Sequence, residues 1–74
     1  MALNADPTMQ IILNGSPREI GRPMNLVALL AEIGLEGKPV VVELDEQAVF
    51  PRDYAEVTVA DGSRVEIVML AAGG

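Results

Sequence analysis

The first apolar segment of the chain predicts a strand that turns back on itself. Residues 9–13 form a short, β-branched and apolar run that ends at Asn14-Gly15. This residue pair is the most typical signal of a two-residue hairpin turn. A return strand is expected over 16–20, ended by Gly21. The pattern therefore predicts a β-hairpin at the start of the domain.

The next apolar positions recur at the spacing of one helix face, i, i+3, i+4 and i+7. These positions are Leu26, Leu29, Leu30 and Ile33. Asn25 is well suited to cap the N-terminus of this helix, because its side-chain oxygen can accept a hydrogen bond from a free backbone N–H. Gly34 suits the left-handed position that follows a helix. The pattern predicts one amphipathic helix.

Alternation resumes in the second half of the chain and predicts further strands. The expected elements are strands at 40–44, 48–50 and 64–70, a helical turn at 52–55 and a turn at Asp61-Gly62. Charged Glu43, Arg64 and Glu66 should face water, so the residues of opposite parity should face the core. The inward set is then Val40, Val42, Leu44, Val65, Ile67 and Met69.

The order hairpin, helix, strand, short edge strand, strand predicts an α+β domain in two layers. One main helix would cover one face of a mixed, four- to five-stranded sheet. Seventy-four residues allow one domain, which we assign to 9–70. Residues 1–8 are expected to be a disordered extension, and 71–74 a flexible tail. The two aromatic residues, Phe50 and Tyr54, are expected to pack the loop around them.

Composition narrows the possible functions. The chain has no cysteine and no histidine, so the commonest nucleophile, general base and metal ligands are missing. An enzyme with its own catalytic site, a metal site or a bound cofactor is therefore not expected. Eleven acidic residues against five basic ones, net −6, argue against nucleic acid as a partner. Acidic residues in the predicted loops are expected to form a solvated surface that could meet basic groups of a partner; they are Asp45, Glu46, Asp53, Glu56 and Asp61.

The location of the protein is expected to be the cytoplasm. Residues 1–8 lack the positive charge and the long apolar core of a secretion signal. No run approaches the roughly 18 apolar residues that a membrane span needs.

The sequence ends in Ala71-Ala72-Gly73-Gly74 directly behind the last predicted strand. Two glycines leave the α-carboxylate of Gly74 free of neighbouring side chains and on a mobile segment. Gly73 is expected to keep the tail slim enough to enter a narrow channel, with Ala71 and Ala72 extending its reach. We therefore expect Gly74 to supply a reacting carboxylate.

A second candidate site consists of strand residues whose side chains are expected to point away from the core. Four apolar residues, Ile12, Val41, Val68 and Leu70, are expected to gather on the open face of the sheet. Exposed apolar patches of this kind commonly mark partner sites. We interpret these four residues as a docking patch beside the tail.

Three stretches, taken in order, resemble the ThiS family of ubiquitin-like sulfur carriers. They are 9–15; 42–45 with 49–54; and Asp61-Gly62 through 65–68 to Gly73-Gly74. The family often has asparagine in place of Asp45 and a second aspartate in place of Ser63. Both differences fall in predicted turns, where they bear on turn geometry or partner contacts.

The resemblance implies a β-grasp fold, with the first and last strands side by side and parallel. It also implies a route: a ubiquitin-activating-type adenylyltransferase uses ATP to adenylate Gly74, and a sulfur donor protein then converts the acyl adenylate to a thiocarboxylate. Thiazole synthase would take that sulfur for thiamin biosynthesis. The carrier would be a co-substrate, and a monomer when free.

Other carriers share these features and stay open as alternatives. The small subunit of molybdopterin synthase has the same fold and Gly-Gly end, but it usually has a proline-containing segment before the tail, which 69–72 lacks. Carriers for cysteine synthesis or tRNA thiolation belong to the same group. A β-grasp interaction module that moves no sulfur is an alternative of a different class.

Overall fold

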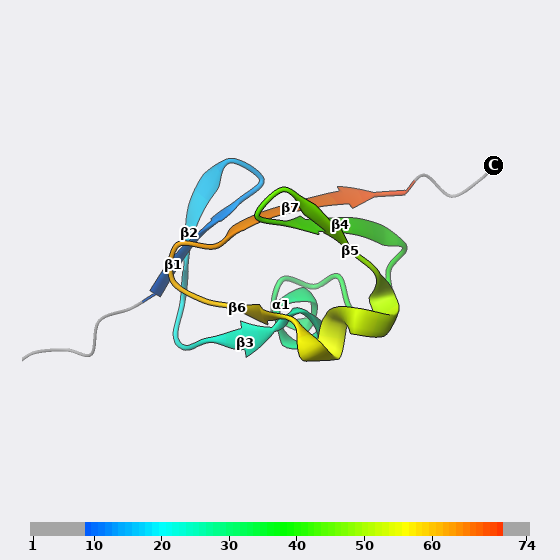
Figure 1. Ribbon diagram of the computed structural model, residues 1–74, viewed down its shortest axis with the longest axis horizontal. Helices are drawn as coiled ribbons and strands as arrows, with labels where there is room; N and C mark the ends of the chain where they lie inside the picture. Colours follow the sequence, from blue (N-terminus) through cyan, green and yellow to red (C-terminus); the bar gives the residue numbers. More distant parts are fainter. Residues whose placement is uncertain (1–8, 71–74) are drawn as a thin grey trace, which may run out of the picture.

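The computed structural model describes residues 9–70, in which a mixed five-stranded sheet is covered on one side by a helix (Figure 1). The predicted extension at 1–8 and the predicted tail at 71–74 lie outside the described residues. In spatial order the strands are β2 (Ser16–Ile20), β1 (Met9–Leu13), β7 (Arg64–Met69), β4 (Val40–Leu44) and β5 (Gln47–Val49). The elements on the covered side are α1 (Leu26–Glu32), η1 (Pro51–Glu56), β3 (Met24–Asn25) and β6 (Thr58–Val59).

The sheet places the last strand at its centre. β1 and β7 run parallel, with Ile12 opposite Arg64, while β7 runs antiparallel to β4. β1 and β2 form the predicted hairpin, and β5 is an antiparallel edge strand. The parallel pairing of the first and last strands confirms the β-grasp arrangement, which periodicity alone did not determine.

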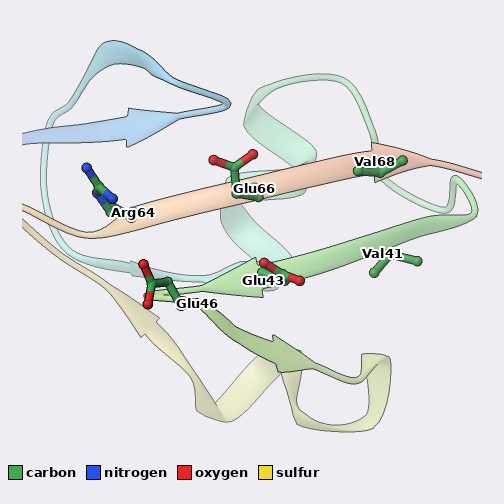
Figure 2. A pocket seen from close by; sticks show the side chains of 6 residues that line it. All are labelled: Val41, Glu43, Glu46, Arg64, Glu66 and Val68. Atoms are coloured by element: carbon green, nitrogen blue, oxygen red, sulfur yellow. The ribbon is translucent and has the colours of Figure 1, made fainter.

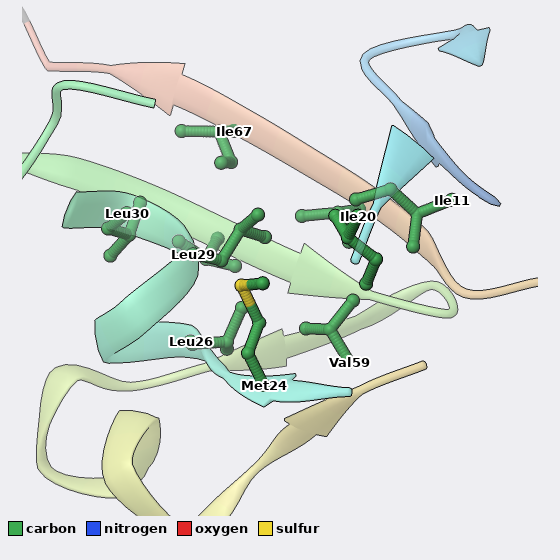
Figure 3. Close-up of a cluster of buried hydrophobic side chains, with 10 residues drawn as sticks. Ile11, Ile20, Met24, Leu26, Leu29, Leu30, Val59 and Ile67 are labelled. Carbon is green, nitrogen blue, oxygen red and sulfur yellow. The ribbon is translucent and has the colours of Figure 1, made fainter. Parts of the chain in front are cut away.

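The core lies between α1 and the inner face of the sheet (Figure 3). Leu26 and Leu29 of the helix are fully buried, as are Val42 and Val65 of the sheet. The predicted helix stripe and the inward parity of β4 and β7 are thus confirmed, with one exception described below. Val40, Leu44 and Ile33 are partly buried and pack against this core.

The signals that begin and end the elements act as predicted. Asn25 Oδ1 accepts a hydrogen bond of 2.8 Å from the Ala28 N–H and so caps α1. Gly34 has a φ of 84°, and Leu35 N–H donates to Leu30 O at 2.8 Å, closing the last turn.

Two predictions about side-chain burial are wrong, namely that Met69 faces the core and that Phe50 packs the loop around it. Met69 is 51% exposed, although its parity is that of the core. The seven residues of α1 cover about 10 Å, whereas the six residues of β7 span about 20 Å, so the helix is too short to cover the end of β7. Phe50 is 56% exposed and lies under the guanidinium of Arg52, 5.3 Å from the ring centroid, instead of packing a loop.

The remaining differences are small. The edge strand is Gln47–Val49 instead of 48–50, β7 ends at Met69 instead of residue 70, and the turn at 52–55 is a 3-10 helix over Pro51–Glu56. The pairing of β3 with β6 was not predicted. Among residues 9–70, the single α-helix is too short to cross a membrane.

Candidate functional site

The face of the sheet opposite α1 carries a shallow hollow of about 350 Å³ (Figure 2). β4, the β4–β5 turn and β7 supply its lining, which consists of Val41, Glu43, Glu46, Arg64, Glu66 and Val68. We call these six residues the open face. Three of the six residues, Arg64, Glu66 and Val68, come from β7, the last strand of the chain before Gly74.

Side chains of the open face stand in pairs across β4 and β7. Val41 lies directly opposite Val68, and Glu43 lies directly opposite Glu66. The two valines are 43% and 59% exposed, and both carboxylates are exposed as well. The face is therefore apolar toward the end of β7 and acidic in its middle (Figure 2).

The structure brings two of the four predicted docking residues together. Val41 and Val68 form the apolar pair of the open face. Ile12 is half-buried on β1 opposite Arg64, at the other end of β7 from Val68. Leu70 is 50% exposed but lines a different groove. The role of these residues in docking stays a prediction.

The groove that Leu70 lines has a volume of about 470 Å³. It lies on the helix side of the sheet, at the end of the domain where β7 ends. Leu70 lines it together with Leu30, Val40 and Tyr54. The Leu70 N–H donates to Pro39 O at 2.9 Å, which fixes the last described residue to the strand ladder. Burial raises the pKa of the Tyr54 phenol.

Two of the predicted surface acids have structural roles. Asp45 Oδ1 accepts a hydrogen bond of 2.9 Å from the Arg64 N–H, and Asp61 Oδ1 accepts one of 2.8 Å from the Gln10 N–H. Ser63 Oγ accepts a hydrogen bond of 3.1 Å from the Ala60 N–H. Of the two positions that differ from the family's usual residues, Ser63 is thus bonded within its own turn, whereas Asp45 is bonded to the first residue of β7.

The other acids remain on the surface. Glu46 and Glu56 are exposed, and Asp53 lies 4.0 Å from Arg52 in an exposed ion pair. Within residues 9–70, no group of three acidic side chains is placed to hold a metal ion. The open face thus combines one exposed valine pair with three carboxylates and one guanidinium. The expected reacting group, Gly74, lies outside the described residues.

The opposition of Glu43 and Glu66 is the feature of this site that sequence reasoning missed. Parity placed both carboxylates on the water-facing side, but parity does not give the register between two strands. A register in which 43 pairs with 66 follows from Val42 and Ile67 both facing the core at matched depth, which only the folded structure shows.

Comparisons with known proteins agree with this fold and with the residues at its end. The ThiS family model matches residues 11–74. The sulfur carrier protein ThiS of Thermus thermophilus is 39% identical over 62 residues, which cover 84% of this chain and 95% of that protein. The thiazole synthase of Paramagnetospirillum magneticum is 38% identical over 66 residues, which cover 89% of this chain but only 20% of that protein.

Solved structures give the same result. The crystal structure of the thiamine biosynthesis protein ThiS from Geobacter metallireducens superposes with a TM-score of 0.78 at 28% identity, covering 89% of this chain and all of that one. A solution structure of a thiamine biosynthesis protein from the same organism gives 0.75, again at 28% identity, covering 89% of this chain and 88% of that one. The chain thus spans nearly the full length of small relatives and about a fifth of a thiazole synthase.

Proposed function

Because the chain belongs to the ThiS family, we propose that it is the sulfur carrier for thiazole formation in thiamin biosynthesis, with Gly74 as the loaded residue. The observation that carries this proposal is the family match, which extends through residue 74 and therefore includes the Gly-Gly segment. The relative from Thermus thermophilus, a sulfur carrier protein, is matched over 95% of its length.

The chemistry we propose needs no side chain of this protein. An α-carboxyl group has an ordinary pKa of about 3.3–3.7, so at neutral pH it is an anion that can attack phosphorus. A carboxylate oxygen of Gly74 would attack the α-phosphorus of ATP and release pyrophosphate. A hydrosulfide delivered by a sulfur donor protein would then attack the acyl carbon, and AMP would leave. The product is a thiocarboxylate.

In this proposal the chain is a co-substrate and binds no cofactor of its own. An adenylyltransferase of the ubiquitin-activating type would bind the ATP, and the exchange would take place in the cytoplasm. Ala71, Ala72 and Gly73 would connect Gly74 to β7, and the absence of a side chain at Gly73 would let the segment pass through a narrow channel. The absence of cysteine and histidine, which weighs against an enzyme, is compatible with such a carrier.

Thiazole synthase is the proposed acceptor of the sulfur. Support comes from the thiazole synthase of Paramagnetospirillum magneticum, in which a segment 38% identical to this chain makes up a fifth of the protein. A carrier-like segment and a synthase that share one polypeptide meet at high effective concentration. This arrangement is expected where one delivers to the other.

A reconstituted loading reaction tests the proposal. The full chain would be incubated with the adenylyltransferase from the same genome, ATP and sulfide, and its intact mass followed. We expect a mass increase equal to the exchange of one oxygen for one sulfur, and no increase in a variant lacking Gly74. The measured mass also gives the terminal residue of the chain directly. No gain in the intact chain would favour a β-grasp interaction module instead.

A second step identifies the pathway. The loaded chain would be given to thiazole synthase and, separately, to the large subunit of molybdopterin synthase. We expect loss of sulfur from the carrier only with thiazole synthase and its substrates. Loss with the molybdopterin enzyme would instead assign the chain to that group of carriers.

A further inference from the structure

Glu43 and Glu66 face each other across β4 and β7, and neither takes part in an ion pair within 4.0 Å among the described residues. They are direct register partners on β4 and β7, and both are exposed. The only ion pair within 4.0 Å among the described residues joins Arg52 to Asp53, on another part of the surface. Like charges directly opposite each other in a sheet are destabilising. The folded chain therefore presents two opposed carboxylates that no cation contacts directly, and the one cation of the open face, Arg64, is outnumbered by three carboxylates.

The surroundings of this pair suit one particular kind of side chain. Val41 and Val68 form the next pair along the same face, about 7 Å away along the strands. Glu46 and Arg64 lie on the other side of the pair (Figure 2). An arginine of a partner could rest its aliphatic stem on the two valines and place its planar guanidinium between the two carboxylates. The open face as a whole has three carboxylates and one guanidinium.

The position of Glu43 and Glu66 relative to Gly74 indicates which partner would supply that arginine. Gly74 is eight residues beyond Glu66, and an extended chain spans at most about 3.6 Å per residue, so the two lie within about 29 Å. An enzyme that adenylates Gly74 must hold a triphosphate and a carboxylate, both anionic, close together. Such sites are lined by basic groups and metal ions. The enzyme surface around the tail is therefore expected to be basic, and the open face is its acidic complement.

We propose that Glu43 and Glu66 together bind one arginine side chain of the adenylyltransferase that activates Gly74. The arginine stem packs on Val41 and Val68. This inference rests on the proposed function, since it assigns a contact to the enzyme that function requires. The carboxylate pair is a binding feature of the carrier and takes no part in the chemistry at Gly74.

Neutral, nearly isosteric variants test this inference. Glu43→Gln, Glu66→Gln and the double variant would be titrated with the purified adenylyltransferase from the same genome by calorimetry, at low and physiological salt. Each single change is expected to raise the Kd by about 10-fold or more. The double change is expected to raise it by less than the product of the two, because both carboxylates hold one group. Glu32→Gln, an exposed carboxylate on α1, is the matched control and should leave the Kd within about twofold.

The stability of the same variants separates binding from folding. Removing one of two opposed charges should raise the Tm by about 1–3 °C, so weaker binding cannot come from unfolding. A Kd unchanged in both single variants, an equal loss in Glu32→Gln, or effects that multiply in the double variant would overturn the inference. A loss confined to thiazole synthase, with the adenylyltransferase unaffected, would overturn it too.

Loading at saturating adenylyltransferase distinguishes this inference from the function it rests on. The glutamine variants should still acquire sulfur at high enzyme concentration, because the reacting carboxylate is unchanged. If they load normally and also bind normally, the proposed function stands and the arginine contact is refuted. If the wild-type chain binds the enzyme but never loads, the proposed function itself fails.

Discussion

The side chain of Asn14 makes two hydrogen bonds to the backbone of Ile67. Asn14 Oδ1 accepts from the Ile67 N–H at 2.7 Å, and Asn14 Nδ2 donates to the Ile67 carbonyl at 3.2 Å. The parallel ladder between β1 and β7 ends at Leu13 and Val65, where the chain turns into the hairpin. The amide of Asn14 therefore continues the ladder by one residue and ties the hairpin to the strand that leads to Gly74.

Replacing Asn14 tests this link. Asn14→Ala should lower the free energy of unfolding by about 2 kcal/mol, because two hydrogen bonds of about 1 kcal/mol each are lost. The φ of 50° at this turn position also disfavours alanine. Urea denaturation monitored by circular dichroism gives the value. Asn14→Asp keeps one acceptor oxygen and should fall between the two. A loss below about 0.5 kcal/mol in Asn14→Ala would show that the contact to Ile67 does not contribute.

A core substitution tests how far this small domain depends on apolar packing. Leu29→Ala should cost about 3 kcal/mol, because Leu29 is fully buried between α1 and the sheet and alanine leaves a cavity. Domains of this size have little stability to spare, so a large unfolded fraction is expected at 37 °C. Val27→Ala on the same helix, at a position 46% exposed, should cost less than about 1 kcal/mol. Equal effects in the two variants would contradict the packing described for α1.

The sequence predicts an element of the fold correctly where its residue pattern is compatible with only one local structure. Asn14-Gly15 required a tight turn, and Leu26, Leu29 and Leu30 fit only a helix with one buried face. β3 and β6 could not be predicted, because two residues are too few to show a period. Met69 has the parity of the core, but its exposure depends on where α1 ends in space, which no local pattern gives.

The candidate site likewise has features that the sequence shows and features that only the folded structure shows. The charge and parity of Glu43 and Glu66 are visible in the sequence, whereas their direct opposition depends on strand register. Leu70 has the parity of Val68, yet it lines the other groove, because the strand ends at Met69. Strand periodicity applies only within a strand.

The β4–β5 turn provides a third prediction, based on backbone strain. Asp45 and Glu46 have φ values of 50° and 72°, in the left-handed region that glycine tolerates best. Glu46→Gly should raise the free energy of unfolding by about 0.5 kcal/mol. Relief of strain contributes about 1–2 kcal/mol, and the greater freedom of glycine in the unfolded chain offsets about 0.4–1 kcal/mol.

Two control variants separate strain from charge and from packing. Glu46→Gln removes the charge but keeps the side chain, so it should lack the gain expected from glycine. Gly15→Ala should destabilise the chain by the same backbone effect, because Gly15 has a φ of 83° and no described atom lies within 4 Å of its added Cβ. A Glu46→Gly variant less stable than wild type would show that Glu46 makes a contribution in this turn that outweighs its backbone cost.

The last prediction concerns the pH dependence that Tyr54 gives to folding. Burial beside the Leu70 groove raises the pKa of its phenol above the ordinary value of 10.0. The neutral phenol is therefore favoured in the folded chain, and the unfolded chain ionises at a lower pH. This contribution to stability is complete below pH 10 and is lost as the pH rises through the folded pKa.

Because Tyr54 is the only tyrosine and the chain has no tryptophan, phenolate absorbance reports this residue alone. The absorbance midpoint should lie above 10 in the folded chain and return to about 10 in urea. The Tyr54→Phe variant should lack this part of the fall in stability. Identical midpoints in folded and unfolded chains, or an identical fall in Tyr54→Phe, would show that the phenol is fully hydrated and that the groove beside Leu70 is open to water at this residue.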